Sequence, residues 1–113
     1  MDSILTSIKE MLGTPADCTD FDATIIMHIN TVLFVLNQNG IGPEEGLIVT
    51  SAEETWDQLI GDSPNNLQAV KTYIYCKVKL VFDPPQSSAH VEALKQTATE
   101  LEWRLNVQSE TNV

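Results

Sequence analysis

Residues 19–40 read TDFDATIIMHINTVLFVLNQNG, and the spacing of their apolar side chains predicts a long helix. We expect it to begin at Thr19 or Asp20, where acidic residues suit the positive end of the helix dipole, and to end at Asn39-Gly40. A helix that is apolar on most of its sides normally lies at the centre of a domain or against neighbours. One stripe contains Phe21, Ile25, Ile29, Val32, Leu33 and Leu36, and Ile26, Met27, Phe34 and Val35 widen it.

A shorter helix is expected upstream, because Asp2 or Ser3 can cap it and Gly13 suits the left-handed residue that ends it. Its apolar residues at helical spacing are Ile4, Leu5, Ile8, Met11 and Leu12.

Downstream, residues 41–50 form a loop, since two glycines and a proline exclude a helix there. Ser51 and Glu54 match a capping box for a second short helix that contains Trp56 and ends at Gly61. The loop is longer than most connections in a domain, so we expect it either to pack down locally or to contact another molecule.

Two further helices follow. The first is expected to begin at Ser63-Pro64 and to stop at Asp83-Pro84-Pro85, and the second is capped by residues 86–88. The apolar pattern ends after Asn106, so we predict an all-α fold of about five helices, two of them short, in a helical domain of residues 1–106 with a flexible C-terminal tail of residues 107–113. The two stripes contain Leu67, Val70, Ile74, Val78 and Val81, and then Val91, Leu94, Ala98, Leu101 and Leu105.

Composition excludes several classes of function. The 113 residues include 6 Lys+Arg and 16 Asp+Glu, a formal net charge of −10, which argues against tight binding to nucleic-acid phosphates or to anionic membranes. No apolar run approaches a membrane span, and the first residues lack the basic start of a signal peptide. Cys18 and Cys76 are interpreted as two reduced thiols, with a disulfide as the lesser alternative.

The sequence contains no convincing catalytic constellation. His28 and His90 lack partners at ligand or triad spacing, the carboxylates are dispersed, and no glycine-rich phosphate loop is present. We therefore expect no enzyme activity, no cofactor and no metal.

Two features allow an interaction role. Lys71, Lys77 and Lys79 form either a solvated face that pairs with acids of the next helix or a cationic strip that meets another copy or partner. The loop 41–50 and the C-terminal tail are either mobile or become ordered on assembly.

Four pieces of the sequence, taken in order, resemble the small head-tail connector proteins of long-tailed bacteriophages and related prophages. The similarity covers nearly the whole chain, and its specificity lies in the combination. The pieces are DFDATIIMHIN (20–30) with GIGP (40–43), ETWD (54–57), AVKTYIYCKV (69–78) with FDPP (82–85), and ELEWRLN (100–106).

The resemblance implies an all-α, non-enzymatic virion protein, made in the host cytoplasm, that forms a ring, expected to be dodecameric. The ring would join the portal to a stopper or neck protein, and genomic DNA would pass through its channel without specific binding. In this family the C-terminal segment commonly contacts the portal, and loops at the other end meet the next ring. The candidates for portal contact are Trp103, Arg104, Asn106, Val107, Gln108 and Val113, and those for the lumen or the next ring are Ile41, Pro43, Glu44, Glu45, Leu47, Ile48 and Val49.

Two alternatives remain open. The chain could be a small acidic helical regulator that binds a cellular protein by mimicking the charge of DNA, although a mimic needs ordered rows of carboxylates. An enzyme with a composite site between subunits is the third hypothesis.

Overall fold

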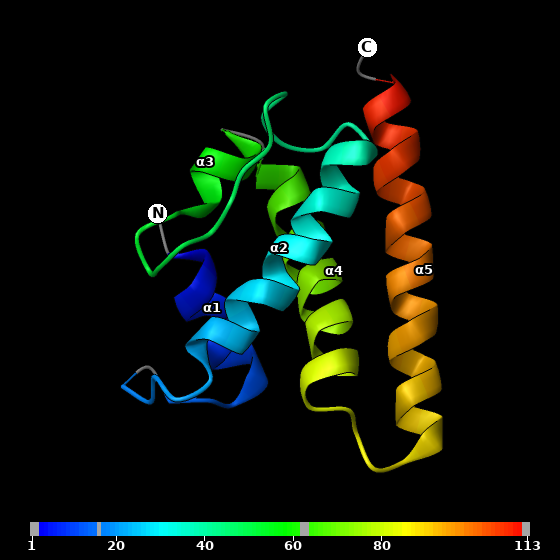
Figure 1. Ribbon diagram of the computed structural model, residues 1–113. Helices are drawn as coiled ribbons and strands as arrows, with labels where there is room; N and C mark the ends of the chain where they lie inside the picture. The colour runs from blue at the N-terminus through cyan, green and yellow to red at the C-terminus, as the bar shows by residue number, and fades with distance from the viewer. Residues whose placement is uncertain (1–2, 16, 62–63, 112–113) are drawn as a thin grey trace.

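The computed structural model describes residues 3–15, 17–61 and 64–111, and it is built from helices (Figure 1). The only β pairing among these residues is an isolated bridge between Ser3 and Thr55, so the predicted all-α class is confirmed. The helices are α1 (Ile4–Leu12), α2 (Asp22–Gln38), α3 (Trp56–Ile60), α4 (Pro64–Phe82) and α5 (Ser88–Thr111).

The central helix is α4, which packs against each of the other four helices. Its side chains Val70, Tyr73, Ile74 and Val78 are fully buried. The most apolar helix, α2, is less central than its composition indicates, because it buries one stripe and leaves Met27 and Phe34 exposed.

The ends of α1 agree with the local rules. The Ser3 hydroxyl accepts a hydrogen bond from the Thr6 N–H at 3.2 Å, and Gly13 ends the helix with a φ of +82°. Both signals were predicted from the sequence, because each depends only on neighbouring residues.

The predicted capping box at Ser51 and Glu54 is wrong by four residues. The box that starts α3 is formed by Thr55 and Gln58, whose side chain accepts from the Thr55 N–H at 2.8 Å. The reason is tertiary: the Ile4 N–H donates to the Glu54 carbonyl at 3.0 Å, and this pairing holds the chain extended up to Thr55.

The last helix is longer than predicted. α5 continues past Asn106 to Thr111, because residues 107–111 contain no glycine or proline and the loss of apolar periodicity does not by itself end a helix. Its start agrees with the prediction, since the Ser87 carbonyl accepts from the Val91 N–H at 3.1 Å. α5 forms one edge of the molecule and packs along α4 (Figure 1). Residues 112 and 113 lie outside the described residues.

Both cysteines are free, as predicted. Cys76 is buried in α4, and this burial raises the pKa of its thiol. Within the described part of the chain, no helix combines the length and hydropathy that a bilayer crossing requires.

Candidate interaction surfaces

The loop after α2 is held against the core by an asparagine. The Asn30 side chain accepts from the Val49 N–H at 2.8 Å and donates to the Val49 carbonyl at 3.0 Å, which is the pairing that a neighbouring strand would provide. Val49 and Ile41 are buried, so these two candidates for contact belong to the core instead. The loop was expected either to pack down locally or to contact another molecule. Its two ends, at Ile41 and Val49, pack locally.

The middle of the loop is also supported from α2. The Asn37 side chain donates to the Pro43 carbonyl at 2.9 Å, and Leu47 is half-buried against the core. Glu44 and Glu45 are exposed, and Ile48 is 69% exposed. The exposed part of the loop therefore includes one large apolar side chain, that of Ile48, and the carboxylates of Glu44 and Glu45.

At residues 50–54 the side chain of Glu54 closes a turn by accepting hydrogen bonds from Thr50 and Ser51, and we call this the carboxylate turn. Glu54 accepts from the Thr50 hydroxyl at 2.8 Å and from the N–H groups of Thr50 and Ser51, each at 3.1 Å. These bonds lower the pKa of Glu54, led by the bond from the Thr50 side chain.

The C-terminal candidates form an apolar pair on α5. Trp103 and Val107 lie one turn apart, and Trp103 is 64% exposed. Arg104 is exposed and pairs with Glu100, one turn earlier on the same helix, at 2.9 Å. Asn106 is half-buried, while the Gln108 side chain and Val113 lie outside what the structure describes.

The two groups of candidates lie at the same end of the molecule. Figure 1 shows the loop after α2 and the C-terminal end of α5 at its top, whereas the turns after α1 and α4 lie at its bottom. The expectation that the loop and the C-terminal segment occupy opposite ends does not hold, because α2 and α5 both run toward the same end.

The three lysines do not form one strip. Six residues of helix place Lys77 roughly 240° around α4 from Lys71, so the two point in different directions. Lys71 lies over the Trp56 ring with Nζ 5.4 Å from its centroid, and Lys79 pairs with Asp83 of its own helix end at 3.0 Å. The expected pairing of Lys79 with acids of the next helix is thus replaced by a local pair.

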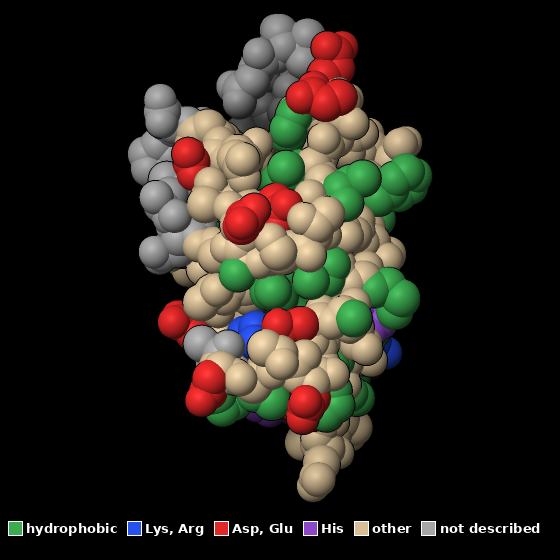
Figure 2. Space-filling view, turned by 60° about the vertical axis from the view of Figure 1, so that its left-hand side comes forward, with side chains coloured by type: hydrophobic (Ala, Val, Ile, Leu, Met, Phe, Trp, Pro, Cys, Tyr) green, Lys and Arg blue, Asp and Glu red, His purple; other side chains and the backbone are tan. Residues whose placement is uncertain are grey.

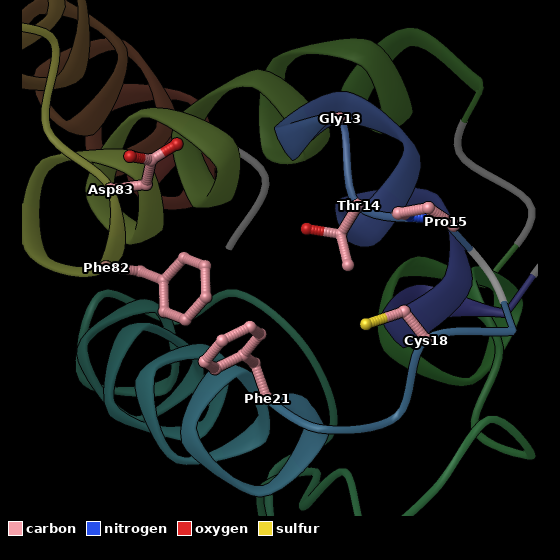
Figure 3. Close-up of a pocket in the computed structure, with 7 residues that line it drawn as sticks. All are labelled: Gly13, Thr14, Pro15, Cys18, Phe21, Phe82 and Asp83. Carbon is pink, nitrogen blue, oxygen red and sulfur yellow. The ribbon is translucent and has the colours of Figure 1, made fainter.

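Sequence reasoning missed a groove at the end opposite Trp103. Figure 3 shows the rings of Phe21 and Phe82 meeting edge to face, with centroids 5.7 Å apart, beside the thiol of Cys18. The groove encloses about 440 Å³, and Phe21 is 53% exposed. Its lining residues are Gly13, Thr14, Pro15, Cys18, Phe21, Phe82 and Asp83.

A buried lysine holds this end together. Lys9 of α1 is 3% exposed, and its ammonium lies 2.8 Å from an Asp22 carboxylate oxygen of α2 and 2.7 Å from the Cys18 carbonyl. The sequence carried one signal for it: Lys9 lies four residues after Leu5 and three before Leu12, a spacing that places it on the apolar side of an amphipathic helix.

No metal centre is assembled within the described residues. No group of three His, Cys, Asp or Glu side chains there could hold a metal ion. The Tyr73 side chain is buried, and this burial, together with the nearby negative charge of Glu102, raises the pKa of Tyr73 to about 12.

Charge is distributed unevenly over the surface. Figure 2 shows acidic side chains spread over one face with very little blue among them. Residues 23–43, which include most of α2, contain no Asp, Glu, Lys or Arg at all. The exposed apolar residues Met27 and Phe34 therefore lie on a stretch of helix that carries no Asp, Glu, Lys or Arg.

Comparison with known proteins gives one match. The model of a family described as phage connector protein matches residues 4–112, which span all five helices. Neither the curated proteins nor the solved structures that were compared contain a match.

Proposed function

Because this chain belongs to the phage connector protein family, we propose that it is a ring-forming head-tail adaptor, seated between the portal of a DNA-filled head and a stopper or neck protein. The family is structural, and its members are components of the virion. The observation that carries the proposal is that the family match extends over the whole helical domain, including α5 with its exposed Trp103.

The end of the molecule that carries Trp103 and Val107 is our candidate for the portal contact. An exposed indole beside an exposed valine is the kind of anchor that protein interfaces bury. Glu44 and Glu45 lie in the loop at this same end, and we assign them to the channel lumen. The opposite end, with Phe21 and Phe82, is then the candidate for the next ring.

The acidic balance supports a passive channel. A ring of twelve copies would carry on the order of 120 formal negative charges, and acidic walls do not bind phosphates. DNA would therefore slide through without adhering. The charge-free run of α2 argues against the alternative of a DNA mimic, which needs continuous rows of carboxylates.

Binding to the portal tests the proposal. Purified portal protein from the same phage genome is mixed with the wild-type chain, with Trp103→Ala, or with a chain that ends at Asn106, and the particles are imaged. We expect added ring density with the wild type and its loss with both variants, while circular dichroism still shows folded helices. Lys95→Ala, an exposed change on the same helix, is the control and should bind normally. No added density with the wild-type chain would reject the adaptor role.

A further inference from the structure

The exposed side of α2 carries a line of uncharged side chains, which we call the neutral stripe. Its residues are spaced three and four apart, so they follow one face of the helix for roughly 21 Å. Met27 is 56% exposed and Phe34 is 65% exposed. The stripe consists of Thr24, Met27, Thr31, Phe34 and Gln38, all exposed.

The centre of the neutral stripe can be covered by another molecule without breaking a hydrogen bond to water that its hydroxyl would need. The Thr31 hydroxyl at its centre already donates to the Met27 carbonyl at 3.0 Å, so covering it leaves no new unpaired donor. Interface centres are typically depleted in charge and enriched in aromatic residues and methionine, which describes Met27 and Phe34.

We propose that a second copy of this chain packs on the neutral stripe; this rests on the proposed ring assembly and identifies one of its lateral contacts. The argument for the occupant is electrostatic. Each copy carries a formal charge of −10, so two copies repel wherever acidic surfaces meet. The run 23–43, which carries the stripe, contains no Asp, Glu, Lys or Arg, so this stretch of α2 itself presents no like charge to another acidic copy.

A closed ring sets the geometry of this contact. In a ring, two different patches of each subunit must meet, so the stripe of one copy faces another element of the next copy and not a second α2. The two subunits also repel each other, because each carries a formal charge of −10. Free subunits therefore associate weakly, and a closed ring on a template combines many such contacts.

Photo-crosslinking tests the contact in the free protein. Benzoylphenylalanine replaces Phe34 in one variant and Val81 in the control, because Val81 is exposed to a similar degree, 61%, but lies on α4 near Lys79 and Asp83. Irradiation of concentrated protein should give several-fold more covalent dimer from position 34. Added NaCl should keep or raise that yield, since it screens the repulsion between acidic copies. Equal yields at the two positions, or no dimer from position 34, would overturn the proposal.

Mapping the crosslink decides the geometry. Mass spectrometry of the dimer should place the partner attachment outside residues 22–38. Attachment to α2 of the second copy would indicate a two-fold pair, which cannot propagate around a ring, and would overturn the assigned lateral contact.

Assembly on the portal separates this inference from the proposed function. Phe34→Glu should lower the number of copies per portal measured by native mass spectrometry, whereas Val81→Glu should match the wild type. If Phe34→Glu gives the same number of copies per portal as the wild type, the proposed lateral contact is wrong, whereas the adaptor role is unaffected. If the wild-type chain does not bind the portal while position 34 still crosslinks, the adaptor role fails and the contact between copies remains.

Discussion

Asn30 binds Val49 through both polar atoms of its amide, at 2.8 Å to the N–H and 3.0 Å to the carbonyl. Val49 is 1% exposed and belongs to no helix, so these bonds satisfy a buried backbone unit that would otherwise have no partner. One polar side chain on an apolar helix thereby holds the Val49 end of the loop between α2 and α3.

Asn30→Ala should destabilise the fold by about 1–3 kcal/mol, because it leaves a buried donor and a buried acceptor unpaired. Urea unfolding followed by circular dichroism gives the free energy. Thr31→Ala, the exposed neighbour, is the control and should change stability by roughly 0.5 kcal/mol or less. An Asn30→Ala variant as stable as this control would show that the loop does not depend on the asparagine.

Lys9→Met should also destabilise the protein, by roughly 1–3 kcal/mol, since Asp22 loses its ion-pair partner and the Cys18 carbonyl loses a donor. This expected loss of stability is smaller than the loss on breaking a fully buried ion pair, because the Asp22 side chain is 25% exposed. Thermal unfolding measures the loss, and Lys95→Met serves as the exposed comparison. Stability that is unchanged by Lys9→Met would mean that hydrophobic packing of the new side chain compensates for the pair.

The two tryptophans should separate stability from assembly. Trp56 is fully buried, donates its indole N–H to the Ser7 hydroxyl at 3.0 Å and lies under Lys71. Truncating Trp56 to alanine should therefore cost roughly 3–5 kcal/mol in unfolding free energy. Trp103→Ala should cost little stability, because the side chain is 64% exposed, and should instead weaken portal binding. A Trp103→Ala chain that unfolds as easily as Trp56→Ala would contradict the assignment of Trp103 to the surface.

The carboxylate turn at Glu54 should give stability a measurable pH dependence. Hydrogen bonds from Thr50 and Ser51 lower the pKa of Glu54 in the folded state below the ordinary value of 4.5. A lowered folded pKa means that the contribution is complete above about pH 4.5 and disappears as the pH falls through the folded value. The difference in unfolding free energy between wild type and Glu54→Gln should thus be largest near neutral pH and shrink toward pH 3. A difference that grows as the pH falls would contradict the sign of the shift.

Much of the molecule followed from local rules alone. The existence and order of the five helices, the Ser3 cap and the Gly13 end each depend on residues close to one another in the sequence, so their spacing was sufficient. The net charge was likewise a property of the sequence alone, and it argued against binding to nucleic-acid phosphates or to anionic membranes.

Features that depend on distant neighbours could not be deduced in this way. The start of α3 was misplaced because the pairing of Glu54 with Ile4 overrides a good capping signal at Ser51. The apolar side chains Ile41 and Val49 were read as contact residues, yet packing buries them, while Phe34 and Trp103 are exposed. Hydrophobic periodicity indicates which side chains gain free energy on burial. The arrangement of the helices determines which of these side chains are buried within one subunit. Those that remain exposed on α2 and α5 are where a second molecule has apolar surface to bury.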